Sequence, residues 1–128
     1  MFLITTYLGP SSIQGTGVFT PVDIPQGTRL WEYTPAVDWK LTPEELELIL
    51  PRLRPRLKTY CYLNAEGFFV LCGDNARFMN HAEDPNCDDP GGEVTIARRD
   101  IRAREELTCD YRRFDHQPAD GGSGPLFG

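Results

Sequence analysis

Residues 77–87 carry the polar side chains of this sequence that are best suited to bind a ligand. The apolar residues of the segment follow neither the period of two of a strand nor the period of about 3.6 of a helix, and its Asn, Asp and Pro residues favour turns. Phe78 and Met79 are bulky and apolar, so we expect the segment to be buried. A buried irregular backbone needs hydrogen-bond partners, and Asn80 and His81 can supply them to that backbone or to a ligand. The residues alone leave both roles open.

Three motifs resemble the signatures of the SET-domain protein-lysine methyltransferases. Residues 77–87 resemble the R-F-x-N-H-S-x-x-P-N-C signature, with Ala82 where serine is usual. Residues 106–111 resemble E-L-x-x-D-Y, and residues 15–17 form an N-terminal G-x-G. A G-x-G by itself is weak evidence. Three motifs in the order and spacing of the family, covering residues 3–114, make a strong resemblance.

The resemblance implies transfer of a methyl group from S-adenosylmethionine to the amine of a lysine side chain. This cofactor supplies the electrophile, so the protein needs neither a metal nor a covalent nucleophile. The lysine must arrive without its proton, although its ordinary pKa is ~10.4. A nearby sulfonium cation and an apolar channel both lower that pKa. The site is therefore expected to combine aromatic walls with oxygen acceptors and few competing charges.

The resemblance also assigns the residues that act on the lysine. Tyr111 would be the catalytic tyrosine, with its hydroxyl directed at the transferring methyl group. Tyr33 is a second candidate, because it stands where the family often has Y-x-G, although here the sequence is Y-T-P. Tyr60 and Tyr62 are candidates for the wall of the lysine channel. Only a tyrosine whose side chain faces the channel can have this role. Cys109 is expected to share a strand face with Tyr111, two residues away.

The cofactor-binding residues implied by the resemblance belong to two of the motifs and to the segment after the third. Side chains and backbone of the N-H pair would contact the cofactor, an arginine nearby could pair with its carboxylate, and the glycine loop would approach its methionine end because glycine lacks a Cβ. An aromatic residue after the last motif is placed near the adenine. These residues are Gln14, Gly15, Thr16, Gly17, Arg77, Asn80, His81 and Phe114.

The cysteines give no indication of a metal site or of disulfides. The four show no C-x-x-C spacing, and we expect reduced, mostly buried thiols. Some members of the family close the site with a zinc cluster that uses the cysteine at Cys87, but no cysteine follows Tyr111 here, so we expect no zinc. Acidic residues near Cys87 lack the spacing of a calcium loop and are interpreted as a solvated acidic loop. These residues are Asp84, Asp88, Asp89 and Glu93.

The composition indicates a single globular domain of 128 residues, with 40% hydrophobic and 25% charged residues. No apolar run approaches the length of a membrane span, and the apolar N-terminus lacks the basic region and cleavage site of a signal peptide. We therefore expect an intracellular protein, cytoplasmic in a bacterium and otherwise nuclear. Residues 1–114 are expected to form the SET domain and residues 115–128 a flexible tail.

The net charge of −6 favours a basic protein partner over nucleic acid. A lysine-bearing substrate such as a histone or histone-like protein fits this charge, and the chain is expected to be a monomer or homodimer. Residues 52–58 carry a basic residue at every second position. They are either a solvated face with leucines turned inward or a contact strip for an acidic partner or nucleic acid.

Short strands are the elements expected to position these residues. The apolar runs bounded by turn formers are residues 2–8, 18–20, 28–33, 60–63, 68–71, 94–97 and 107–110. Residues 64–67 would form the turn of a hairpin. This pattern predicts a mostly β fold with one or two short helices. The resemblance implies the SET fold of small curved sheets, with a C-terminal pseudoknot in which residues 106–111 pass through a loop near residues 77–87.

The sequence also indicates one helix and one short repeated motif. Thr42 and Glu45 form a capping box at a helix start, and Pro51 is expected to end that helix. The pair Asp-Ile at residues 23–24 recurs at residues 100–101, which suggests two similar strand pairs. Arg104 stands where the family usually has glycine, and a positive φ there would cost about 1 kcal/mol.

These observations favour a stand-alone SET-domain lysine methyltransferase. The rival from another class is a non-catalytic SET-like module that binds a protein or the cofactor without turnover. Tyr111 argues against that rival, because a module released from catalysis does not need its hydroxyl. A nucleic-acid binder that uses residues 52–58 is a third alternative, which the overall acidity disfavours.

Overall fold

The computed structural model describes residues 1–53, 61–113 and 115, and in this part of the chain it contains ten short strands and one α-helix. The mostly β class is therefore confirmed. The strands are β1 Tyr7–Pro10, β2 Thr16–Phe19, β3 Arg29–Glu32, β4 Trp39–Leu41, β5 Cys61–Leu63, β6 Phe69–Leu71, β7 Asn80–His81, β8 Cys87–Asp88, β9 Val94–Ala97 and β10 Glu106–Cys109. The helices are α1 Pro43–Leu53 and the 3-10 helices η1 Asn75–Phe78, η2 Pro90–Gly92 and η3 Tyr111–Arg113.

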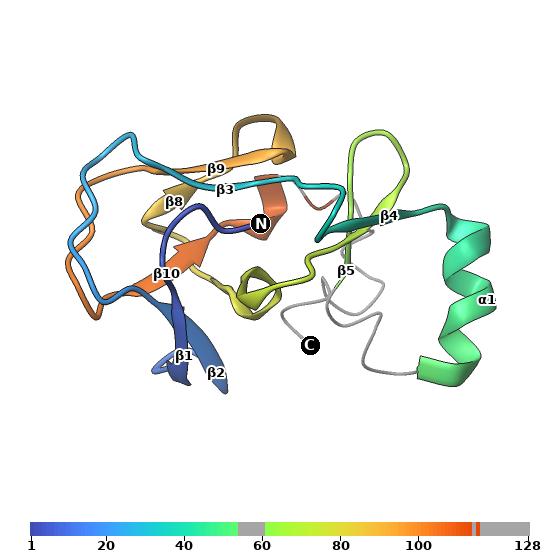
Figure 1. Ribbon diagram of the computed structural model, residues 1–128, viewed down its shortest axis with the longest axis horizontal. Coiled ribbons are helices and arrows are strands. Elements are labelled where there is room, and N and C mark those ends of the chain that lie inside the picture. The colour runs from blue at the N-terminus through green and yellow to red at the C-terminus, as the bar shows by residue number, and fades with distance from the viewer. Residues whose placement is uncertain (54–60, 114, 116–128) are drawn as a thin grey trace.

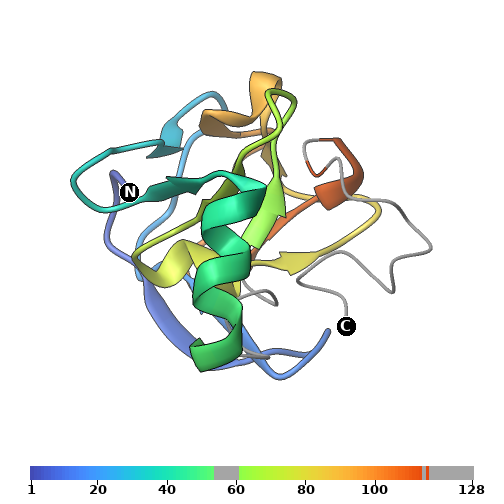
Figure 2. The same cartoon turned by 90° about the vertical axis from the view of Figure 1, so that its right-hand side faces the viewer.

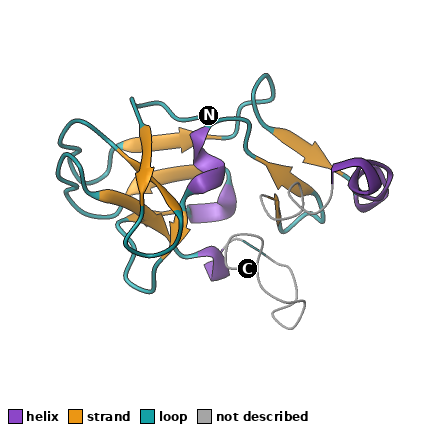
Figure 3. Ribbon diagram, turned by 90° about the horizontal axis from the view of Figure 1, so that it is seen from below, coloured by secondary structure: helices purple, strands orange, loops and turns teal. Residues whose placement is uncertain are grey.

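The strands form three small sheets, with the orders β1-β2-β10-β7, β3-β9-β8 and β4-β6-β5. The third sheet and α1 lie together at one end of the molecule, and α1 is outermost (Figure 1). Figure 2 looks from that end, so α1 stands in front of the sheets. Figure 3 shows the strands of the other two sheets gathered at the opposite end. The predicted hairpin is confirmed, because β5 and β6 pair antiparallel around its turn.

The C-terminal strand β10 is held from two sides. Along one edge it pairs antiparallel with β2, and along the other it pairs parallel with β7. Beyond β7, the Ala82 N–H donates to the Cys109 carbonyl at 3.0 Å. The Asn86 amide then donates to the Glu106 carbonyl at 2.7 Å and accepts the Thr108 N–H at 2.8 Å. Residues 80–86 thus wrap around β10, which is the pseudoknot that the resemblance implied.

The two Asp-Ile pairs, at residues 23–24 and 100–101, form turns that contact each other. Ile24 and Ile101 form an isolated antiparallel bridge, and both are buried. The Asp100 carboxylate accepts the Gln26 N–H, and the Asp23 carboxylate accepts the Ala103 N–H, each at 2.8 Å. The two Asp-Ile units therefore stabilise each other and tie the first sheet to the second.

Arg104 has a positive φ of 71°, at the position equivalent to Gly27 in the first unit, where φ is 87°. The positive φ considered for Arg104 is therefore observed. Its backbone N–H donates to the Thr20 carbonyl at 2.8 Å, and this contact helps to hold the left-handed turn.

Helix α1 begins as predicted. The Glu45 N–H donates to the Thr42 hydroxyl at 3.1 Å, and the Thr42 N–H donates to the Glu45 carboxylate at 2.9 Å. The expectation that Pro51 ends the helix is wrong, because the helix continues to Leu53. A proline deprives a helix of one N–H, and so close to the end the remaining turn is too short for a kink to matter.

The N-terminal strand is shifted from its expected position. Residues 2–8 were expected to form it, but β1 begins at Tyr7 and the residues before it serve a different sheet. Phe2 forms an isolated bridge with Trp31, and the Leu3 N–H donates to the Leu30 carbonyl at 2.7 Å. The apolar run is shared between two sheets, which periodicity within the run cannot show.

The main core takes side chains from all three sheets and contains the fully buried side chains of Val18, Leu30, Ile101 and Leu107. The four cysteines are buried, and each is a free thiol, as expected. Burial raises the pKa of the Cys61 thiol to about 12, so it stays protonated at neutral pH. None of the helices in the described residues is long and apolar enough to span a membrane.

Candidate active site

The Tyr111 hydroxyl lies in the interior of the molecule. Tyr111 opens η3 directly after β10 and is 4% exposed. Its hydroxyl donates to the Met79 carbonyl at 3.0 Å, so the segment just before β7 fixes its direction. Burial raises the pKa of Tyr111 well above its ordinary value. The group is therefore a neutral hydroxyl at physiological pH and can donate and accept hydrogen bonds.

Cys109 reaches the same pocket as Tyr111, although β10 ends at Cys109 and the two residues do not share a regular strand. Its thiol is 3.9 Å from the Asn80 carbonyl oxygen and donates to it. Burial raises the pKa of the Cys109 thiol well above its ordinary value. The side chain is thus a small, neutral group beside the tyrosine.

The pocket around these two residues has an empty volume of about 390 Å³, part of which opens to solvent. Tyr62 and Arg77 line it as well, so four of the residues singled out from the sequence meet there. Burial also raises the pKa of Tyr62, whose hydroxyl donates to the Gly92 carbonyl at 3.1 Å. We refer to this space as the channel pocket. It has the aromatic walls and oxygen acceptors that transfer to a lysine amine requires.

Two further residues line the channel pocket, although the sequence did not predict this position for them. Trp31 lines it and is 4% exposed, and its indole N–H has no acceptor among the described residues. Asp89 also lines it and accepts a hydrogen bond from the Thr95 hydroxyl. For Asp89, the interpretation as part of a solvated acidic loop is wrong, because the residue is half-buried at the N-terminus of η2 and lines the pocket. Strand alternation could not have placed Trp31, because the adjacent Leu30 and Trp31 are both buried and the pairing of β3 with β9 is irregular there.

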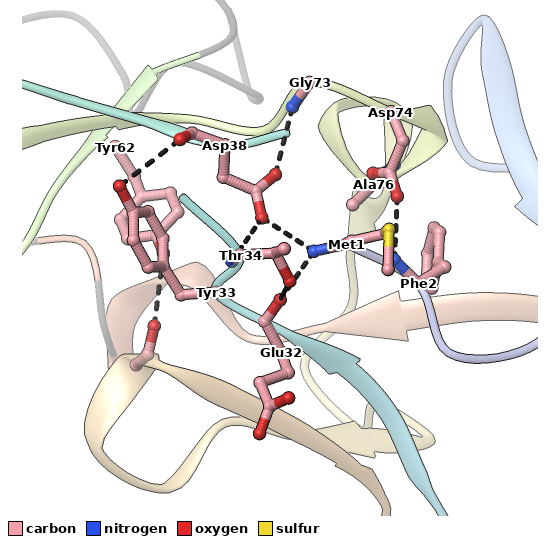
Figure 4. A network of polar contacts seen from close by, with 11 residues as sticks. Met1, Phe2, Glu32, Tyr33, Thr34, Asp38, Tyr62, Gly73, Asp74 and Ala76 are labelled. Carbon is pink, nitrogen blue, oxygen red and sulfur yellow. Dashed lines mark hydrogen bonds and ion pairs between the residues drawn. The ribbon is translucent and has the colours of Figure 1, made fainter. Parts of the chain in front are cut away.

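Tyr33 lies outside the channel pocket. Its hydroxyl donates to the Asp38 carbonyl at 3.3 Å, within the polar network drawn in Figure 4. The buried Asp38 carboxylate organises this network and accepts the N–H groups of Thr34 at 2.9 Å and Gly73 at 3.1 Å. Burial, opposed by the attraction of Lys40, raises the pKa of Tyr33. The structure therefore does not bring Tyr33 beside Tyr111, and Tyr60 and Phe114 lie outside the described residues.

Asn80 ties the glycine loop to the segment that bears the channel pocket. Its side-chain amide lies 3.0 Å from the Gln14 carbonyl and 3.2 Å from the Thr16 carbonyl, and 2.9 Å from Oε2 of Glu106. The Ser11 hydroxyl donates to the other oxygen of Glu106 at 2.7 Å. The carbonyl of the same Asn80 faces Cys109, so one residue connects the two halves of the site.

Gly17 is required by a close approach. A Cβ at this position would lie 2.4 Å from the Glu106 carboxylate, so any larger residue would displace that side chain. Gly15 has a φ of 49°, which turns the loop towards β2. Both glycines were predicted to approach the cofactor. Nothing in the sequence indicated that the Glu106 side chain packs against Gly17.

His81 sits between the motifs. Its Nδ1 accepts the Tyr111 N–H at 3.3 Å and lies 3.6 Å from Oδ1 of Asp110. Hydrogen bonds from the Arg112 guanidinium lower the pKa of Asp110, so the carboxylate stays charged. His81 therefore helps to hold the backbone on which Tyr111 is mounted.

The residues on the loop side fit S-adenosylmethionine by their chemistry. Gln14, Gly15 and Thr16 are exposed and held at fixed backbone positions by Asn80. Arg77 lies between this side and the channel pocket and offers a guanidinium that suits a carboxylate. The buried Trp31 N–H adds a donor that a bound acceptor would satisfy. In the described part of the chain, no three His, Cys, Asp or Glu side chains are grouped so as to hold a metal ion.

The fold and the site together define a class of small β domains. In this class a wrapped C-terminal strand carries a tyrosine into a pocket next to a glycine loop. The SET domain model matches residues 15–112, and the chain belongs to the SET domain family. The expectation drawn from the three motifs is confirmed.

The chain is similar to parts of much longer methyltransferases. It is 29% identical over 119 residues to the histone-lysine N-methyltransferase ash1 of Drosophila melanogaster, covering 84% of this chain and 5% of that protein. It is 30% identical over 120 residues to the human histone-lysine N-methyltransferase 2D, covering 87% of this chain and 2% of that protein. The chain thus spans a small fraction of the length of these relatives.

Solved structures show the same fold. A humanized mutant of the Chaetomium thermophilum Polycomb Repressive Complex 2, bound to an inhibitor, matches with a TM-score of 0.68 and 26% identity, over 89% of this chain and 16% of that one. A Plasmodium falciparum protein described as a candidate histone methyltransferase matches with a TM-score of 0.61 and 21% identity, over 84% of this chain and 93% of that one. At this identity the second likeness concerns the fold alone.

Proposed function

We propose that the protein is a protein-lysine N-methyltransferase that uses S-adenosylmethionine. The observation that carries the proposal is the buried Tyr111 hydroxyl, held by the Met79 carbonyl at the wall of the channel pocket. When bound, the cofactor supplies a methyl group on a sulfonium, an electrophile that needs no metal. Membership of the SET domain family supports the assignment.

We assign the site residues to two groups, one that would bind the cofactor and one that would line the lysine channel. Asn80 and Glu106 hold the glycine loop, and Gln14, Gly15, Thr16 and Gly17 would meet the cofactor with Arg77 and His81. On the other side, Tyr62 and Cys109 line the channel and Tyr111 orients the amine by its hydroxyl oxygen. An apolar channel disfavours the lysine cation, so the walls promote loss of its proton before transfer. Tyr33, Tyr60 and Phe114 remain candidates for these two groups.

The substrate that we propose is a basic protein, of which histones are the leading class. The named relatives act on histone lysines, and the net charge of −6 favours basic partners. From the histone-methyltransferase relatives we further propose that the protein acts inside the cell, in the nucleus of a eukaryote or in the cytoplasm of a bacterium. Monomer and homodimer both remain compatible with this role.

A non-catalytic module that binds the cofactor or a protein is the second candidate. It would keep the loop contacts of Asn80 but would have no use for a hydroxyl buried at Tyr111. Labelled methyl transfer separates the two. Incubation with labelled S-adenosylmethionine and a host lysate, followed by mass spectrometry, should identify a labelled lysine, whereas a binding module would label nothing.

Cofactor binding is tested by thermal unfolding. At ~100 times the dissociation constant, the cofactor should add ~2.7 kcal/mol of stability and raise the melting temperature. Asn80→Ala should abolish the rise, because the glycine loop loses its ties. Asn64→Ala removes a comparable turn contact far from the loop and should keep it. An unchanged melting temperature of the wild type at millimolar cofactor would contradict the proposal.

A further inference from the structure

A second pocket lies next to the channel pocket and shares Tyr62 with it. Tyr33, Glu93 and the hairpin turn at residues 64–66 form its other walls, around an empty volume of about 430 Å³ that is partly open to solvent. Because Tyr62 belongs to the walls of both spaces, a chain that inserts a lysine into the channel pocket can bring a neighbouring side chain to the second one. We call this space the side pocket.

The side pocket already binds a cation supplied by the chain itself. Lys40 Nζ is 2.7 Å from Oε1 of Glu93 and 4.4 Å from the centroid of the Tyr33 ring. The ring face and the carboxylate both attract an ammonium group. The hydrogen bond to Glu93 is the main cause that raises the pKa of Lys40, and Glu66 adds to it. The walls therefore have the chemistry of a site for a basic side chain.

The ion pair that holds Lys40 in the side pocket is partly exposed to solvent. The Lys40 side chain is 27% exposed and that of Glu93 is 54% exposed, and ion pairs this close to solvent contribute little to stability. The ammonium can turn into water without leaving a buried charge behind. An incoming guanidinium would meet the same carboxylate with two N–H groups and could stack on the Tyr33 ring, which an ammonium cannot do.

We propose that the side pocket binds a basic side chain, arginine above all, that flanks the target lysine in the substrate protein. Lys40 occupies the pocket when no substrate is bound. Glu93 and Glu66 provide the charge, and Tyr33 provides the ring face. The inference rests on the proposed function, because it specifies the substrate of that site.

The test uses a set of peptides with one lysine, in which one arginine is moved through the flanking positions and replaced by alanine in the reference peptide. Binding is followed by fluorescence anisotropy and methyl transfer by mass. At one position, arginine should improve binding and kcat/KM by about fivefold over alanine. Glu93→Gln should reduce this preference to near one, and Lys40→Met should increase it.

Glu47→Gln is the matched control, because Glu47 is exposed on α1, away from the side pocket, and the substitution changes the net charge equally. This control variant should keep the arginine preference. That result would show that the preference comes from the side pocket and not from general attraction to an acidic surface. Equal loss in Glu47→Gln and Glu93→Gln, or no arginine preference in either readout, would overturn the side pocket. A preference in binding that depends on Glu93, without any methyl transfer, would instead count against the proposed function and leave the side pocket in place.

Discussion

At the scale of single residues, the site depends on a few contacts that join segments far apart in sequence. The Met79–Asn80 dipeptide is the clearest case, since the carbonyl of Met79 holds Tyr111 and the side chain of Asn80 holds the glycine loop. A shift of this dipeptide would move both halves of the site at once. Substitutions here should therefore alter cofactor binding and transfer together, whereas those at the pocket wall should affect transfer alone.

Replacing Tyr111 by phenylalanine tests the pocket wall. Turnover should fall by about 10²-fold or more, because a positioned hydroxyl acts mainly in the transition state. The Met79 carbonyl loses its partner, which should cost about 1–2 kcal/mol of stability but leave the fold intact. Cofactor affinity should hardly change. The measurements are single-turnover rates and cofactor titrations, with Tyr7→Phe at an exposed tyrosine as control. Unchanged turnover would transfer the catalytic role to another tyrosine.

Cys109 determines how much room a methylated amine has beside Tyr111. The resemblance implies that an aromatic residue at this position limits the product to fewer methyl groups. A thiol is small and binds water weakly, so we expect the wild type to add more than one methyl group. Cys109→Tyr should stop after one, and Cys109→Ser should not. Intact-mass time courses on a single-lysine peptide check this, and a wild type that stops at one would show that Trp31 or Tyr62 fills the space instead.

At the scale of secondary structure, locally encoded elements were predictable and pairings between distant segments were not. The β5–β6 hairpin and the capped start of α1 follow from turn formers and a capping box within a few residues. Strand β7 has two residues, and it exists because β10 lies alongside it. No pattern within residues 77–87 could indicate that pairing, since its partner lies in another motif.

The same division applies to the candidate site. Tyr111, Cys109, Arg77 and Tyr62 could be named from the resemblance, and they meet in one pocket. Trp31 could not be assigned to that pocket, because it and its neighbour Leu30 are both buried and strict alternation does not hold in β3. Tyr33 shows the opposite case, since it was a candidate from its position in the sequence and its side chain lines the side pocket instead.

The cap of α1 provides a test at this scale. Thr42→Ala removes the hydroxyl that accepts the Glu45 N–H and should lower the free energy of unfolding by about 1 kcal/mol. Cofactor binding should stay unchanged, since α1 packs on the third sheet at the far end of the molecule. Urea denaturation measures the stability, and Thr5→Ala at an exposed loop position is the control. A loss as small as that of the control would mean that the capping box is not formed in solution.

At the scale of the whole molecule, we predict that the domain folds without a bound metal ion. The four buried cysteines are free thiols, and the Cys87 thiol donates to the side-chain amide oxygen of Asn86. We predict well under one zinc ion per chain in protein purified without chelator. Elemental analysis checks the prediction, and added chelator should leave the melting temperature unchanged. One tightly bound zinc per chain would contradict it.

The wrapping of β10 by residues 80–86 has a consequence for the order in which the chain can fold. Strand β10 pairs with β2, whose residues lie almost at the other end of the chain, and with β7 from the middle. Contacts of such long sequence separation form late and slowly, because their loops must close first. Only Asp110 separates Tyr111 from β10, so the residue that we propose to orient the amine is among the last to reach its place. On the ribosome, an emerging chain would therefore be inactive until the wrapped strand has been drawn in.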